Sequence, residues 1–148
     1  MNKITQFDIG MFEDGLRHGD TIQAYQNIAT KSAIYPGQGT PLGLVYVALK
    51  INGEAGELAE HVGKAMRDDC LISMGYRDEA THDACFVYDE LTPERRALII
   101  KEAGDILWYL SAICNELGIT LSEVAVENLN KLADRTRRNV LSGSGDER

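Results

Sequence analysis

Two short acidic motifs carry the clearest chemical signal in the sequence. Glu54 and Glu57 are three residues apart in Gly-Glu-Ala-Gly-Glu-Leu-Ala-Glu, and Glu102 and Asp105 have the same spacing in Lys-Glu-Ala-Gly-Asp-Ile-Leu-Trp-Tyr-Leu. Residues at i and i+3 of a helix share one face. Apolar residues surround both pairs, and burying a carboxylate without a positive partner costs much free energy. We therefore expect the four carboxylates to bind a divalent metal ion.

Hydrophobic periodicity predicts that a long helix positions each pair. The first helix runs over 42–66, where Glu54 takes a position that the pattern would assign to a hydrophobic residue. The second begins at Thr92 and Pro93, which combine an N-cap hydroxyl with proline at the first helical position, and it continues to Leu117. Side chains of two antiparallel helices packed about 8–10 Å apart can meet at one point. An all-oxygen site of this kind suits Mg²⁺ or Mn²⁺ better than zinc or copper.

The remaining segments complete an all-α prediction with four main helices. Another helix is expected over 21–33, and a capping box from Thr120 to Glu123 opens the last one, which continues to about Val140. Residues 68–91 show no sustained period, so we expect a long acidic loop between the second and third main helices, either a solvated connection or a substrate lid. We divide the chain into an N-terminal arm (1–20), one domain (21–140) and a disordered tail (141–148).

Bulk composition limits the possible partners. With 148 residues, 44% of them hydrophobic, the chain fits one globular domain. A net charge of −8 argues against binding to a nucleic-acid polymer, which requires a basic surface. Three cysteines without C-x-x-C spacing indicate neither a disulfide framework nor a thiolate zinc site. No leader pattern and no apolar run near the ~20 residues of a membrane span is present, so we expect a cytoplasmic protein without membrane contact.

A polar line on the last predicted helix could complement the metal site. Asn128, Lys131 and Arg135 share one side of that helix and would supply an amide and two cations to a polyphosphate. Carboxylate-held Mg²⁺ most often serves phosphate substrates. The alternative is an exposed helix face whose cations complement the helix dipole.

Together these motifs resemble the MazG-type members of the all-α nucleoside triphosphate pyrophosphohydrolases. The resemblance rests on Glu-x-x-Glu, then Glu-x-x-Asp, then Asn-x-x-Lys-x-x-x-Arg, with Tyr25-Gln26 and the segment 30–36 before them. It covers roughly residues 21–139 and is similar to the small, single-domain phage and bacterial members. The 68–91 segment is longer than that family leads us to expect.

The resemblance implies an activity and roles for the site residues. Water activated by Mg²⁺, or by Mn²⁺ in its place, would attack the α-phosphate of a nucleoside triphosphate and release a monophosphate and pyrophosphate. Relatives favour deoxynucleotides, guanine first, and form dimers or tetramers; a phage-encoded member would work in the host cytoplasm. The metal ligands would be Glu54, Glu57, Glu102 and Asp105, one glutamate of the first pair would also orient the water, and the substrate-binding residues would be Asn128, Lys131 and Arg135.

Several alternatives stay open at this point. The acids could be solvent-facing helix edges, the same fold could hydrolyse (p)ppGpp or a modified nucleotide, or the chain could be a non-catalytic helical interaction module. A di-iron bundle fits poorly, because the Glu-x-x-His match at Glu79 and His82 falls in the irregular segment. We interpret Glu60 and Lys64 as an exposed ion pair, and His61 as a core or interface histidine.

Overall fold

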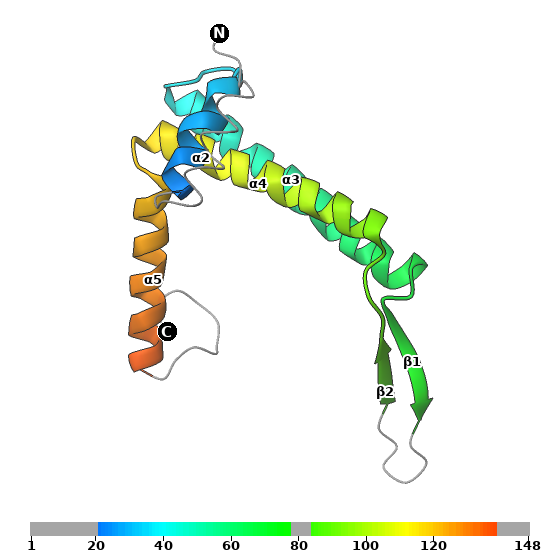
Figure 1. Ribbon diagram of the computed structural model, residues 1–148. Coiled ribbons are helices and arrows are strands. Elements are labelled where there is room, and N and C mark those ends of the chain that lie inside the picture. The colour runs from blue at the N-terminus through cyan, green and yellow to red at the C-terminus, as the bar shows by residue number, and fades with distance from the viewer. Residues whose placement is uncertain (1–20, 78–83, 139–148) are drawn as a thin grey trace. The chain divides into compact units, whose positions relative to one another are not determined.

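Helices dominate the structure, as the sequence predicts. The computed structural model describes residues 21–77 and 84–138; the predicted arm and tail lie outside them, and the extent of the 21–140 domain stays a prediction. No helix in these ranges is long and apolar enough to cross a membrane. Figure 1 shows the elements in order: α2 (Thr21–Ala29), η1 (Thr30–Ser32), α3 (Pro41–Asp68), β1 (Ile72–Arg77), β2 (Ala84–Tyr88), α4 (Pro93–Leu117) and α5 (Leu121–Arg137).

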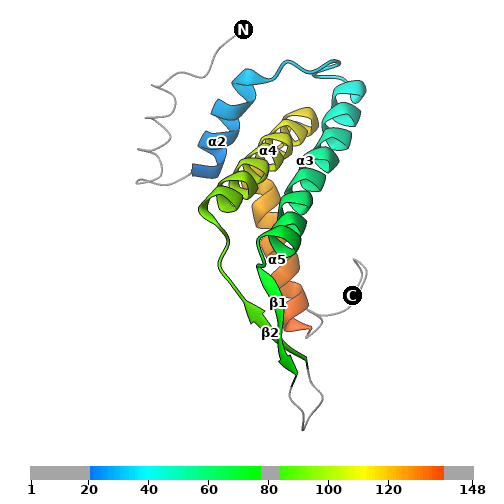
Figure 2. The same cartoon turned by 90° about the vertical axis from the view of Figure 1, so that its right-hand side faces the viewer.

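The chain divides into two compact units. One is Ala48–Tyr109, and the other joins Met1–Val47 with Leu110–Arg148. In the Ala48–Tyr109 unit, α3 and α4 lie side by side in both views and run in opposite directions (Figures 1 and 2). The helix predicted from Thr92 and Pro93 indeed begins at Pro93. This antiparallel pair is the arrangement that two facing carboxylate motifs require.

The segment between α3 and α4 corrects one expectation. We predicted no strand in 68–91, but β1 and β2 form an antiparallel hairpin in which Met74 lies opposite Phe86 and Ile72 lies opposite Tyr88. Its apolar side chains Met74, Phe86, Val87 and Tyr88 are all exposed. Because Phe86, Val87 and Tyr88 are consecutive, they point to both faces, so neither face is buried and the sequence lacks the alternation that usually reveals a strand. The interpretation of this segment as an irregular loop was therefore wrong.

Gln26 connects α2 to the turn between α4 and α5 within the other unit. Its side chain is 3% exposed. The amide nitrogen donates to Asn115 Oδ1 at 2.8 Å and to the Ile119 carbonyl at 3.1 Å, and Oε1 accepts from the Leu121 amide at 2.7 Å. The Leu121 amide is one of the first-turn donors that α5 cannot satisfy by itself. One buried side chain thus fixes where α5 starts.

Two local signals in this unit agree with the sequence. Thr120 and Glu123 form the predicted capping box, with Thr120 Oγ1 accepting from the Glu123 amide and Glu123 Oε2 accepting from the Thr120 amide. Before α3, Gly37 adopts φ +72°, and a Cβ there would meet Leu42 Cβ at 2.8 Å. Only glycine fits that turn without strain.

We expect Gln26→Leu to lower the free energy of unfolding by about 2 kcal/mol, because the Leu121 amide and the Ile119 carbonyl lose a buried partner. Urea denaturation followed by circular dichroism measures this change. Gln23→Leu is the matched control, one turn earlier on α2, where the amide donates to Asn27 at the surface. Equal losses in the two variants would contradict the role of Gln26.

Candidate metal centre

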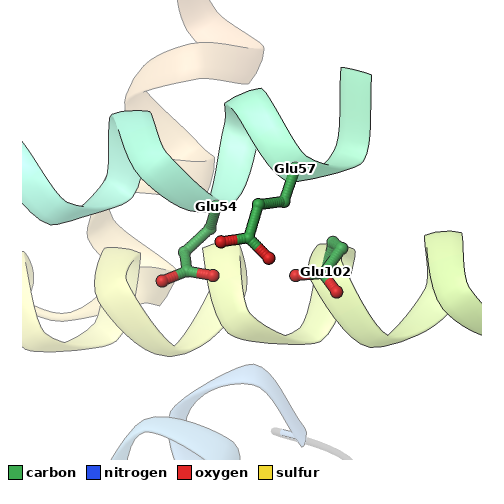
Figure 3. A group of neighbouring side chains, drawn as sticks. All are labelled: Glu54, Glu57 and Glu102. Atoms are coloured by element: carbon green, nitrogen blue, oxygen red, sulfur yellow. The ribbon is translucent and has the colours of Figure 1, made fainter. Parts of the chain in front are cut away.

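Three of the four predicted carboxylates meet between α3 and α4. Glu54 and Glu57 project from α3 and Glu102 from α4, and one oxygen of each lies within 4.8 Å of the others (Figure 3). The i,i+3 spacing gives the two α3 side chains a common face, and the antiparallel partner presents Glu102 to that face. The Ala48–Tyr109 unit therefore forms a cluster of carboxylate oxygens.

Glu102 is the buried member of this cluster, with 2% of its side chain exposed. Lys101 Nζ donates to Oε1 at 2.9 Å, and His61 Nε2 lies 3.9 Å from the same oxygen. The other oxygen, Oε2, is buried and has no hydrogen-bond partner among the described residues. A buried carboxylate oxygen without a donor is costly and rare in native proteins. The Glu102 carboxylate also lies beside two further carboxylates, and a cation would be stabilised there.

The pKa of Glu54 is affected by the other carboxylates close to it. Burial raises the pKa of Glu54 above its usual value, and the negative charges of Asp105, Glu57 and Glu102 raise it further, with Lys50 acting in the opposite direction. In the absence of a metal, the fold therefore disfavours the charged form of this carboxyl group.

Asp105 lies outside the group of three carboxylates, but its negative charge acts on Glu54. It contributes to the raised pKa of Glu54, and its Oδ2 is 3.7 Å from Lys101 Nζ. Lys101 thus contacts both acids of the second motif, a role that sequence reasoning missed. The i,i+4 spacing from Lys101 to Asp105 was the available signal.

The donor set fits a hard divalent cation. All three ligand candidates offer carboxylate oxygens, the atoms that Mg²⁺ and Mn²⁺ prefer. Adjacent oxygens on an octahedral Mg²⁺ with bonds of about 2.1 Å are about 3 Å apart and opposite ones about 4.2 Å apart, so three oxygens that lie within 4.8 Å of one another would have to move closer together to bind one ion.

The predicted substrate-binding residues lie in the other unit. Asn128 and Lys131 line one hollow of about 700 Å³ together with Ile119, Glu123, Val124 and Glu127. Arg135, one turn further along α5, does not line this hollow and is only 7% exposed. The structure therefore brings two of the three residues to one surface, and two glutamates share that surface with them.

Two further interpretations concern α3. Glu60 and Lys64 form the exposed i,i+4 ion pair that the spacing predicts, so this third acid of the first motif is paired outside the cluster. His61 is partly buried, and one ring nitrogen faces Glu102.

Comparison with known proteins assigns the class. Residues 46–140 match the MazG nucleotide pyrophosphohydrolase domain, a range that includes both acidic motifs and the α5 line. The chain is 38% identical over 131 residues to the Gene 37 protein of Mycobacterium phage L5, which covers 86% of this chain and 98% of that protein. No solved structure matches the chain. The mostly helical structure is consistent with the all-α fold of this domain family. The chain belongs to the MazG domain family.

The raised pKa of Glu54 predicts how stability depends on pH without metal. The native state holds this proton more tightly than the unfolded chain, so the stabilisation is complete below the unfolded pKa of about 4.3 and is lost as pH rises through the raised native pKa. In EDTA, the Tm should therefore fall with pH over that window, and Glu54→Gln should flatten the fall. Thermal unfolding between about pH 4 and 8 measures this. Glu60→Gln, outside the cluster, should leave the fall in place; an unchanged slope in Glu54→Gln would contradict the assignment.

Proposed function

We propose that this protein is a divalent-metal-dependent hydrolase that converts nucleoside triphosphates into nucleoside monophosphates and pyrophosphate. The observation that supports this most strongly is the cluster of Glu54, Glu57 and Glu102, in a chain of the MazG family. The buried Glu102 also has a carboxylate oxygen without a hydrogen-bond partner among the described residues. Solvent-facing acids on helix edges, the alternative from sequence, would not leave Glu102 buried.

Each carboxylate has a role in this proposal. Glu54, Glu57 and Glu102 would hold the metal, and Asp105 would be the fourth ligand. Bound Mg²⁺ or Mn²⁺ would neutralise phosphate oxygens and lower the pKa of a water molecule. A glutamate of the first pair accepts the proton of the attacking water, and Glu57 is the more exposed candidate. The water oxygen bonds to the α-phosphorus, the bond from that phosphorus to the bridging oxygen breaks, and pyrophosphate leaves with the bond electrons.

The substrate and assembly are finer parts of the proposal. Asn128 and Lys131, which line the hollow on α5, bind phosphate or sugar, and the buried Arg135 is the weaker candidate for this role. A deoxynucleoside triphosphate with guanine is the favoured substrate. The four helices would form a bundle in a homo-oligomer in the cytoplasm, or in the host cytoplasm of a phage. Exposed apolar side chains along α5 support the oligomer, because an apolar surface of this kind usually marks an interface: Val124, Val126, Leu129 and Leu132.

We expect pyrophosphate release in Mg²⁺ from at least one (d)NTP, loss of activity in EDTA, and recovery with Mg²⁺ or Mn²⁺. A coupled pyrophosphate assay over all eight nucleotides, with (p)ppGpp and modified nucleotides in parallel, also tests the alternative substrates. If no nucleotide is hydrolysed and no metal binds, the chain is a helical interaction module instead of an enzyme.

Single substitutions test the residue roles. Glu57→Gln should lower kcat by about 10²–10⁴-fold, because it removes a proton acceptor and a ligand charge. Asp105→Asn should also abolish turnover, and both variants should keep their helical circular dichroism. Glu60→Gln, also in the first motif but paired with Lys64, is the control and should retain activity. Full turnover in either site variant removes that residue from the site.

A further inference from the structure

His61 lies between the carboxylate cluster and an arginine. Its Nε2 is 3.9 Å from Glu102 Oε1, and its Nδ1 is 3.5 Å from Arg95 Nη1. The side chain is 18% exposed. The sequence suggested a core or interface histidine, but these contacts place both ring nitrogens against charged groups of α4.

Arg95 is itself fixed by a two-pronged ion pair. Its Nε donates to Asp69 Oδ2 at 2.7 Å and its Nη2 to Asp69 Oδ1 at 3.2 Å. Asp69 lies directly after the end of α3 and Arg95 in the first turn of α4, so this pair joins the ends of the two helices. Both side chains are more than four-fifths buried. A bidentate pair of this kind fixes the plane of the guanidinium, which leaves Nη1 directed at His61.

This geometry selects one tautomer of His61. Arginine has donors only and is always protonated, so the histidine Nδ1 that faces it must be the acceptor. The proton of the neutral ring is then on Nε2, the nitrogen that faces Glu102. The gap of 3.9 Å is about 1 Å longer than a hydrogen bond, so a small movement of the Glu102 carboxylate would complete the contact.

The two carboxylate oxygens of Glu102 therefore have different neighbours. Lys101 and His61 both approach Oε1, whereas Oε2 has no partner in the described chain. Lys101 makes the shorter contact, at 2.9 Å, but from a side chain that is 65% exposed, whereas His61 is 18% exposed and also contacts Arg95. Of the two, His61 is the more buried neighbour.

We infer that His61 is a positioning residue: oriented by the Asp69–Arg95 pair, it holds Oε1 of Glu102 and turns Oε2 toward the metal. The inference rests on the proposed metal site, and it assigns His61 a role in metal affinity without direct ligation. A hydrogen-bond partner behind a metal ligand typically changes metal affinity 10–100-fold.

Two isosteric variants separate this role from a structural one. The amide nitrogen of glutamine reaches approximately the place of Nε2, whereas asparagine reaches only the place of Nδ1. His61→Gln should therefore keep Mn²⁺ affinity within a few-fold of the wild type, and His61→Asn should lose about 10-fold or more. The measurement is Mn²⁺ titration of the full chain without nucleotide, by electron paramagnetic resonance of free Mn²⁺. If His61 only packs against Arg95, the order reverses, because asparagine keeps that contact.

A second pair of variants tests the chain of contacts from its other end. Arg95→Met should weaken Mn²⁺ binding, and Arg67→Met, which removes an exposed ion pair with Asp68, should not. This pair decides the question if either His61 variant fails to fold. Equal Mn²⁺ affinity in Arg95→Met and wild type overturns the inference.

The outcomes also separate this inference from the proposed function. Wild type that binds Mn²⁺ with the expected order of variants, but releases no pyrophosphate, leaves the inference standing and overturns the activity. Wild type that binds no Mn²⁺ overturns the metal site and the inference together.

Discussion

The structure of the Ala48–Tyr109 unit depends on how the buried charge of Glu102 is tolerated. A carboxylate that is 2% exposed and faces two other carboxylates should be strongly destabilising. Lys101 offsets part of this repulsion at one oxygen of Glu102. The pKa of Glu54 is raised first by burial and then by the charges of Asp105, Glu57 and Glu102, so repulsion persists in the cluster. Two long antiparallel helices are needed because the acids must be held together against their own repulsion. The Asp69–Arg95 pair closes the hairpin end of these helices.

Charge arithmetic explains why a divalent cation suits the cluster better than another side chain. Three clustered carboxylates carry a charge of −3, and Lys101 supplies +1, which leaves −2 when all are ionised. One Mg²⁺ or Mn²⁺ balances this remainder, whereas a second lysine would balance half of it and would require room for a four-carbon chain. Asp105, at the edge of the cluster and 3.7 Å from the same Lys101, makes the sum −3, of which a divalent cation would leave −1.

Features that depend on local sequence were predictable, and features that depend on tertiary contacts were not. The α4 start at Pro93, the Thr120 capping box and the pairing of Glu60 with Lys64 follow from neighbours within one turn. The convergence of Glu54, Glu57 and Glu102 was also predictable, because two i,i+3 motifs on antiparallel helices have few other ways to face each other. The hairpin was missed since it has no buried face to impose alternation. Arg135 was predicted to share a polar, substrate-binding side of the last helix with Asn128 and Lys131, yet it is buried, and the helix pattern alone does not reveal which side of α5 is covered.

His61 shows the limit of reading one helix at a time. On α3 alone, a histidine on the apolar stripe has no distinctive signal, and a core position is the natural interpretation. The contacts that distinguish His61 come from α4. Arg95 and Glu102 are seven residues apart on this helix and so lie two turns apart on one face. His61 fits between those two turns, with an obligate donor at one ring nitrogen and a carboxylate near the other. The i,i+7 spacing of Arg95 and Glu102 therefore places a donor and a carboxylate at the two nitrogens of one ring, and the surroundings of the candidate metal centre extend two helical turns along α4.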